Sequence, residues 1–215
     1  MEIIDTSVRN AWKKTIAAID SHGSSYVDSD KRVCIELLNV TLVLKDMKDI
    51  LSPLEYISQS KKWIYPRPQE IENFVLDGNL SPSFAYSYGE RLFLYQHKSP
   101  INQIDSYVIP LLKKHSLSRR AVAVIWNPEK DTLSKEHVPG LIYVDFKLRQ
   151  GKLFAFCAIR SCDCLIGLPA NMYELYCLTK YVAKKLSATI GDLTFHLHSS
   201  HIFKDYAEEI KRISS

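Results

Sequence analysis

One short segment gathers polar side chains directly before a stretch with helical spacing. In chain order they are Arg160, Ser161, Asp163, Gly167 and Asn171. A guanidinium fork matches the oxygens of a phosphate or carboxylate, and a side-chain amide both donates and accepts hydrogen bonds. The same residue types are also typical of a surface ion pair, an ordinary turn and a helix N-cap. The segment therefore predicts a small-ligand site or, failing that, a capped turn.

A second group of candidates lies outside this segment. Arg119 and Arg120 are adjacent, Tyr88 precedes a glycine, and His137 stands three residues before Gly140. The formal net charge of +4 is mild and no basic run exceeds three residues, so a small anion fits better than a nucleic acid as the partner. Taken alone, the arginines fit a solvated loop pair, the tyrosine a core residue, and the histidine a base or a loop residue.

The cysteines bear on redox state and metal binding. They are Cys34, Cys157, Cys162, Cys164 and Cys177. An odd number, scattered through apolar surroundings, favours reduced thiols in a cytoplasmic protein over a disulfide framework. Two of them form a C-x-C, but no second pair or histidine cluster accompanies it at ligand spacing. We therefore predict buried thiols and no metal site.

Length and composition bound the architecture. The chain has 215 residues, of which 46% are hydrophobic and 24% charged, which predicts a single domain over residues 1–215. No run of 18 apolar residues occurs, and the first residues have neither a basic nor an apolar signal region. We therefore expect no membrane partner, no secretory signal and a cytoplasmic location.

Hydrophobic periodicity outlines the elements that would position the candidates. Helices are predicted over residues 7–23, 101–116 and 170–186, and strands over residues 32–46, 119–128, 140–148, 153–159 and 193–203. The strand over 119–128 fits the fully buried type, and the two strands that flank RQGK form a hairpin. Strands without regular βαβ alternation predict an α+β fold with a large mixed sheet.

Three segments resemble, in chain order, signature segments of the thymidylate synthase family. They are YSYGERLF, SRRAVAVIWNPEKD and RSCDCLIGLPANMYELYCLTKYVAKKLSATIGDLTFHLHSSHIF. The likeness is strong over residues 84–203 and is greatest to the short archaeal-type members. It implies the family's large mixed β-sheet flanked by helices, a homodimer formed sheet to sheet, and a pyrimidine nucleoside monophosphate (dUMP, dCMP or CMP) as the ligand.

By this resemblance, groups from two subunits would hold the nucleotide phosphate. Arg160 and Ser161 would bind it in one subunit, and Arg119 and Arg120 would reach it from the other. Several donors around one dianion offset the cost of removing it from water.

The resemblance also assigns residues to the base and the sugar. Asn171 matches the asparagine that reads the pyrimidine edge, and Asp163 and Gly167 match the acid and glycine that lie near the base and the folate. His201 matches the histidine that contacts the sugar. Tyr88 matches a tyrosine beside the catalytic residues.

One departure from the family removes its nucleophile. The family's cysteine lies twenty residues before the phosphate-binding arginine, and this position is Gly140 here. The cysteine attacks C6 of the pyrimidine so that C5 can accept a one-carbon unit, and a glycine cannot do this. Cys157, Cys162 and Cys164 would each approach the base differently and fit core packing better. His137 is left as a base or a loop histidine.

A second departure concerns the sugar. Phe203 stands where the family has a tyrosine whose hydroxyl helps to bind the 3′-hydroxyl of deoxyribose. The loss of such a hydrogen bond, worth about 1 to 3 kcal/mol when its partner is buried, predicts a shifted sugar preference. The chain also ends fourteen residues after His201, without the long C-terminal segment of bacterial members.

These observations leave three interpretations. The first is an enzyme that acts on the nucleotide, ancestrally a C5 methyl or hydroxymethyl transferase using methylenetetrahydrofolate, now without the thiolate. Hydrolysis of the glycosidic bond is one such reaction. The second is a non-catalytic homologue that binds a nucleotide or a partner. In the third, Gly140 is an introduced change that traps a substrate complex.

Overall fold

The sheet of the protein combines strands from residues 2–44 with strands from residues 122–203. The computed structural model describes residues 1–60, 62–78, 86–95, 99–134 and 138–214. The strand order is β1 (Glu2–Asp5), β3 (Val33–Leu44), β7 (Thr189–Phe203), β6 (Lys152–Asp163), β5 (Leu141–Arg149) and β4 (Val122–Val124), with β2 (Ser24–Val27) paired to β3. Because β1 pairs parallel with β3 whereas β2 and β4 pair antiparallel with their neighbours, the sheet is mixed, as predicted.

The chain forms two compact units. The first comprises Met1–Tyr65, Ile159–Tyr173 and Thr194–Ser215, and the second comprises Pro66–Ala158 and Glu174–Leu193. The prediction of a single domain stays a prediction. No helix in the described part of the chain is long and apolar enough to cross a membrane.

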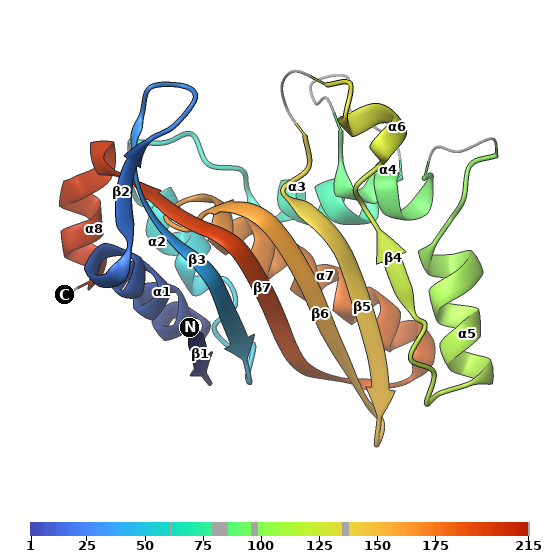
Figure 1. The fold of residues 1–215 in the computed structure, drawn as a ribbon. Coiled ribbons are helices and arrows are strands. Elements are labelled where there is room, and N and C mark those ends of the chain that lie inside the picture. The colour runs from blue at the N-terminus through green and yellow to red at the C-terminus, as the bar shows by residue number, and fades with distance from the viewer. Residues whose placement is uncertain (61, 79–85, 96–98, 135–137, 215) are drawn as a thin grey trace. The chain divides into compact units, whose positions relative to one another are not determined.

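In the first unit, α1 (Val8–His22) confirms the predicted N-terminal helix. The Ser7 hydroxyl caps it by accepting from the Asn10 amide at 3.2 Å, and Asp49 accepts from the Val8 amide at 2.8 Å. Its apolar face, including Trp12, is buried, and the helix lies along β1 and β3 (Figure 1). The same unit contains α2 (Ser52–Ser58), the 3₁₀ turn η2 (Lys204–Tyr206) and α8 (Ala207–Ser214).

In the second unit, the helix predicted over residues 101–116 is present but begins with a wider turn. A π-helical segment, η1 (Ile104–Val108), runs into α5 (Ile109–Lys114). The amides of Val108 and Ile109 bond to carbonyls five residues back. Pro110 has no amide hydrogen to continue an α-helical ladder, and this explains the change of pitch. The unit also contains α3 (Pro68–Leu76), α4 (Tyr88–Phe93) and α6 (Pro128–Asp131).

The prediction of a fully buried strand over residues 119–128 is wrong. Only Val122–Val124 form β4, which ends the strand order, and Val124 is 39% exposed. The Gln103 amide takes the place of a further strand, because it accepts from the Val124 amide at 2.8 Å and donates to the Val124 carbonyl at 2.7 Å. The apolar run therefore marks an edge strand paired to a side chain.

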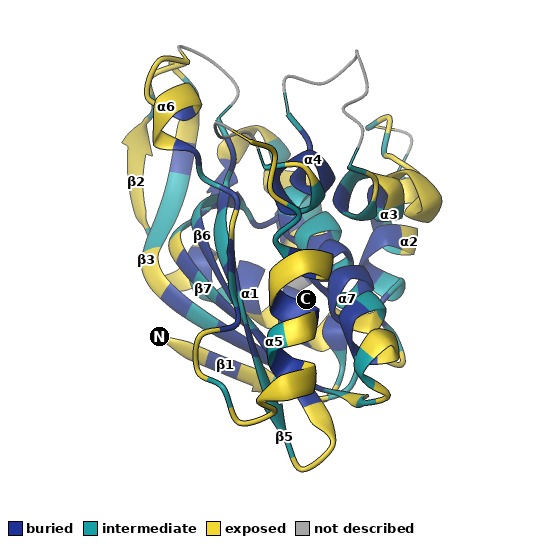
Figure 2. Cartoon of the chain, turned by 90° about the vertical axis from the view of Figure 1, so that its right-hand side faces the viewer, coloured by how far each residue is buried: buried dark blue, intermediate teal, exposed yellow. Residues whose placement is uncertain are grey.

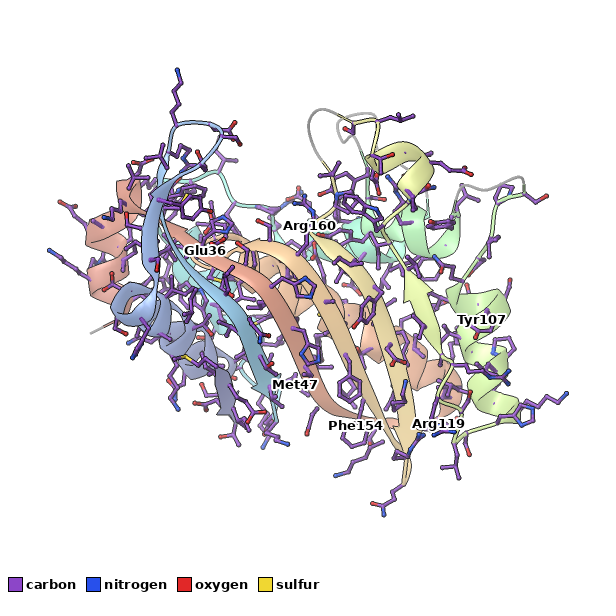
Figure 3. The ribbon with its side chains drawn as sticks, viewed as in Figure 1. Glu36, Met47, Tyr107, Arg119, Phe154 and Arg160 are labelled. Atoms are coloured by element: carbon purple, nitrogen blue, oxygen red, sulfur yellow. The ribbon has the colours of Figure 1, made fainter. Side chains whose placement is uncertain are left out.

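The predicted hairpin is confirmed, with β5 and β6 joined through Gln150 (φ 49°) and Gly151 (φ 73°). Two left-handed residues match the twist of the flanking strands. The turn is exposed (Figure 2). However, β6 continues to Asp163, so Arg160 lies on a strand rather than in the predicted turn (Figure 3). The next helix, α7 (Gly167–Leu186), begins three residues earlier than predicted.

Candidate functional site

The first unit brings seven of the predicted site residues onto three neighbouring segments. They are Arg160, Ser161 and Asp163 at the end of β6, Gly167 and Asn171 at the start of α7, and His201 and Phe203 at the end of β7. The Cys164 amide donates to the His201 carbonyl at 2.8 Å, which joins the two strand ends. The second unit contains Tyr88, Arg119, Arg120 and Gly140, and His137 lies outside the described residues.

The turn after β6 is fixed through its backbone. Asp163 Oδ1 accepts from the amides of Leu165 and Ile166 at 3.0 and 3.3 Å. The Trp12 indole donates to the Cys164 carbonyl at 2.8 Å, and the Tyr65 hydroxyl donates to the Ile166 carbonyl at 2.6 Å. Burial nevertheless raises the pKa of Asp163, although these amides and His201 act in the opposite direction.

One ring nitrogen of His201 is buried and unpaired among the described residues. Its Nδ1 is buried and finds no hydrogen-bond partner in the part of the chain that the structure describes. Burial lowers the pKa of His201, and the Asp163 carboxylate only partly opposes this shift. The imidazole is therefore neutral near pH 7, and Nδ1 is a donor or an acceptor according to the tautomer.

The lowered pKa of His201 predicts a pH-dependent stability. Above about pH 6.5 the ring is neutral in both folded and unfolded chains, but below it the unfolded chain takes up the proton first, so stability falls. Asp163, whose pKa is raised, acts in the opposite sense at lower pH. When the pH is lowered from about 7.5 to about 5.5, the melting temperature of a His201→Gln variant should therefore fall less than that of the unmodified protein.

The matched control is His198→Gln, which changes an exposed histidine on the same strand. Thermal unfolding at several pH values gives the comparison. If the melting temperature of His201→Gln depends on pH as that of the unmodified protein does, His201 titrates alike in the folded and unfolded chains.

Phe203 is covered by a cation that the sequence did not single out. The Arg32 guanidinium carbon lies 3.4 Å from the Phe203 ring centroid, and Arg32 Nε lies 3.5 Å from an Asp205 carboxylate oxygen. The His201 ring lies edge-on to Phe203, with centroids 5.1 Å apart. Arg32 also acts electrostatically on both Asp163 and His201. The ring that lacks a hydroxyl is thus paired with a side chain rich in donors.

Asn171 is not a helix N-cap, contrary to one of the predicted alternatives. It is the fifth residue of α7, and its Oδ1 atom lies 3.9 Å from the Cys162 sulfur. The helix starts earlier because Gly167, Leu168 and Pro169 all fit its first turn, where a proline needs no hydrogen-bond partner.

The cysteines are poor substitutes for a missing nucleophile. All five are reduced and buried, as predicted. Burial, together with the nearby Glu174, raises the pKa of Cys157. A thiol with a raised pKa forms little thiolate at neutral pH. No group of three metal-ligating side chains occurs within the described ranges.

In the second unit, Tyr88 lies in an aromatic cluster on α4. It is buried, and its ring centroid is 5.2 Å from that of Phe74 and 6.0 Å from that of Tyr86. The next residue must be a glycine, because a Cβ on Gly89 would lie 2.0 Å from the Asp77 carbonyl oxygen. This close approach fixes where α4 begins.

A buried ion pair joins α4 to α6. Arg91 Nη2 donates to Asp131 Oδ1 at 2.7 Å, and the other oxygen of Asp131 accepts from the Asn127 amide at 2.7 Å. Removing one partner of such a pair costs about 3–5 kcal/mol, because the other charge stays buried. The pair therefore holds the segment that carries Tyr88.

The Arg119–Arg120 segment has a fixed backbone and exposed side chains. The Tyr107 hydroxyl donates to the Arg120 carbonyl at 2.6 Å, and the Arg120 amide donates to the Ser118 hydroxyl at 3.2 Å. Neither guanidinium pairs with a carboxylate of any residue that the structure describes. Tyr107 and Arg119 are marked in Figure 3. Both guanidinium groups are therefore available to an external anion.

Comparison with known proteins decides the family. The model of the family described as thymidylate synthase matches residues 32–214. The chain belongs to the thymidylate synthase family. A protein of Methanosarcina barkeri named "Putative thymidylate synthase" is 32% identical over 197 residues, which cover 92% of this chain and 87% of its own. A protein of the same name from Methanocaldococcus jannaschii is 42% identical over 127 residues, which cover 57% of this chain and 57% of its own.

A more distant member is the thymidylate synthase of Bacillus phage phi3T, which is 24% identical over 135 residues. The 135 aligned residues cover 63% of this chain and 47% of the phage protein. The resemblance inferred from the signature segments is thus confirmed, as is the fold that it implied. In this thymidylate synthase-like chain the individual site residues remain proposals.

Proposed function

We propose that the protein binds a pyrimidine nucleoside 5′-monophosphate (dUMP, dCMP or CMP) at the strand ends of the first unit. The observation that carries this proposal is the meeting of Arg160, Ser161, Asp163, Asn171 and His201 within one unit of a family member. Arg160 and Ser161 bind the phosphate, Asn171 pairs with the base, and His201 bonds to the sugar. Arg32, which stacks on Phe203, would add a further cation.

The second part of the proposal is a homodimer with shared sites. Arg119 and Arg120 have exposed guanidinium groups on a fixed backbone, which supports a role toward an anion of another subunit. A two-fold dimer formed sheet to sheet would give each site both arginine sets.

The proposed chemistry does not begin with a thiolate. We assign Gly140 to the place of the nucleophile, and the buried cysteines do not replace it. Methylenetetrahydrofolate, used by the family, supplies a one-carbon unit when it is bound. Asp163 would hold it, because only Oδ1 of this carboxylate is occupied by amides of the described residues. Without a nucleophile, however, C5 of the base is not activated.

A reaction that fits the remaining groups is hydrolysis of the glycosidic bond. Water attacks C1′, the C1′–N1 bond breaks, and the products are the free base and the sugar 5-phosphate. His201 would accept the proton of the water, and a protonated Asp163 would donate one to the leaving base. Environments that shift the pKa values of two neighbouring groups in opposite directions support such a division of roles. The alternative is a homologue that binds the nucleotide without reaction.

The experiment for this function is a comparison of nucleotides with nucleosides. Because phosphate contacts of charged donors contribute about 1.5–3 kcal/mol each, CMP, dCMP or dUMP should bind about 100-fold more tightly than the matching nucleoside. Isothermal titration calorimetry measures both affinities. Equal affinity for nucleotide and nucleoside would contradict the phosphate site.

A further inference from the structure

The second unit carries a concentration of positive charge that comes from three separate segments. They are the end of α5 with the loop after it (residues 113–120), the β5–β6 turn (residues 145–152) and the end of α7 with the start of β7 (residues 184–189). These segments contain nine lysines and arginines and one acid, Asp145, whereas the rest of the chain contains nineteen and twenty-three. The positive charge of a nearly balanced chain is therefore gathered in one region.

Hydrogen bonds join the three segments. Arg149 Nη1 donates to the Ser116 carbonyl at 3.5 Å, and the Thr189 amide donates to the Gly151 carbonyl at 2.9 Å. The ends of α5 and α7 accordingly lie beside the β5–β6 turn (Figure 1). Because all three segments belong to the second unit, they form one continuous surface.

Most of the cations on this surface have no acidic partner. Lys147 forms an ion pair with Asp145. Six others form no ion pair with any residue that the structure describes, and none of the six belongs to the proposed phosphate site; we call them the basic patch: Lys113, Lys114, Arg149, Lys152, Lys184 and Lys185. Arg149 is half-buried and the five lysines are exposed. The patch is therefore open to an external anion.

Helix ends account for only part of this charge. Four of the six cations lie in the last turns of α5 and α7, where a lysine complements the helix dipole. Each helix C-terminus contributes about half a negative charge, so the two ends offset about one of the six positive charges. Arg149 and Lys152 lie on strands and complement no helix end. The patch thus stays strongly positive.

The composition of the three segments decides which polyanion fits. A protein partner favours a buried apolar centre, but Leu117 is the one exposed apolar side chain here. A single-stranded nucleic acid favours aromatic platforms, but the one aromatic residue in these segments, Phe146, is buried. The dense phosphates of a duplex need only cations, whose binding releases counterions. A duplex is therefore the favoured partner.

We propose that the basic patch binds the phosphate backbone of a double-stranded nucleic acid without reading its sequence. The sequence favoured a small anion because basic runs along the chain are short, whereas the fold brings cations from three segments together. The patch excludes Arg119 and Arg120, so this function goes beyond the proposed binding of a nucleoside monophosphate.

The test measures binding of the unmodified full chain to a DNA duplex and an RNA duplex of about 20 base pairs by fluorescence anisotropy. If the patch contacts about four phosphates, raising the salt concentration from about 50 to about 100 mM should weaken binding about 10-fold. Both duplexes should bind within about 3-fold of each other, and more tightly than a single strand or polyglutamate of equal length. Absence of binding, insensitivity to salt, or a preference for the single strand, for polyglutamate or for one duplex would overturn the proposal.

Variants locate the binding. One triple variant removes a cation from each segment: Lys114→Gln, Lys152→Gln and Lys184→Gln. Its affinity for the DNA duplex should fall at least about 10-fold at about 50 mM salt. The control makes the same change in net charge at three exposed lysines of the first unit, and its affinity should be unchanged: Lys48→Gln, Lys204→Gln and Lys211→Gln. Thermal unfolding shows that both variants fold.

Two outcomes would place the duplex elsewhere. Equal losses in the two triple variants would mean that net charge, and not the patch, binds the duplex. Displacement of the duplex by an excess of CMP would place it on the proposed nucleotide site. Either result overturns the proposal. The affinity for CMP is measured without any duplex, so this proposal and the proposed function fail independently.

Discussion

Proteins carrying Arg160→Ala or Arg120→Ala should each bind nucleotide about 100-fold more weakly than the unmodified chain, and a mixture of the two should recover. In either homodimer, every site lacks one arginine. In a mixed dimer both losses fall in one site, so the other is intact. With equal mixing about half of the dimers are mixed, so about a quarter of the sites should regain full affinity.

Calorimetry after dissociation and reassembly measures the recovered fraction. Arg67→Ala is a suitable control, because this exposed arginine pairs with Glu70 within α3 and belongs to neither proposed clamp. No recovery despite demonstrated subunit exchange would mean that Arg120 acts within its own chain or not on phosphate. The hypothesis of a shared site would then be abandoned. The role of Arg160 would still be supported by the weaker nucleotide binding of Arg160→Ala.

The second large effect is expected at Gly140. Incubated with dUMP and methylenetetrahydrofolate, the unmodified protein should release no proton from C5, because no side chain at this position can add to C6. A Gly140→Cys variant supplies a thiol there and should gain measurable release. Tritium released from C5-labelled dUMP gives the rate.

Gly140→Ser is the matched control, since it adds a side chain of similar size with a much weaker nucleophile. Robust release by the unmodified protein would show that another group attacks the base. Chromatography of the same mixtures with CMP, dCMP and dUMP separates the remaining functions. If the unmodified protein releases free base and His201→Gln does not, hydrolysis is supported. If the nucleotide stays unaltered, a binding protein is supported.

Elements defined by local pattern could be predicted from the sequence. The apolar face of α1 repeats at helical spacing and needs no other part of the chain for its definition. The β5–β6 turn follows from its left-handed residues, of which Gly151 is the clearest signal. The phosphate segment was found for a different reason, because its motif resembles that of a family.

Features that depend on distant contacts could not be predicted. β4 looked buried because its residues are apolar, but the partner of its outer edge is Gln103, about twenty residues away. Arg32 follows a charged turn that gives no sign of its stacking on Phe203, which lies at the opposite end of the sequence. Such pairings are set by the order of strands in the sheet, which local periodicity does not encode.

The side-chain amide on β4 also limits how copies of this protein can associate. An edge strand with free amides and carbonyls is a template for intermolecular β-sheet and for aggregation. Gln103 engages both the amide and the carbonyl of Val124, the last residue of β4, so this end of the short edge strand offers no free backbone groups to an incoming strand. Extension of the sheet by strand pairing at this end of β4 is thereby disfavoured.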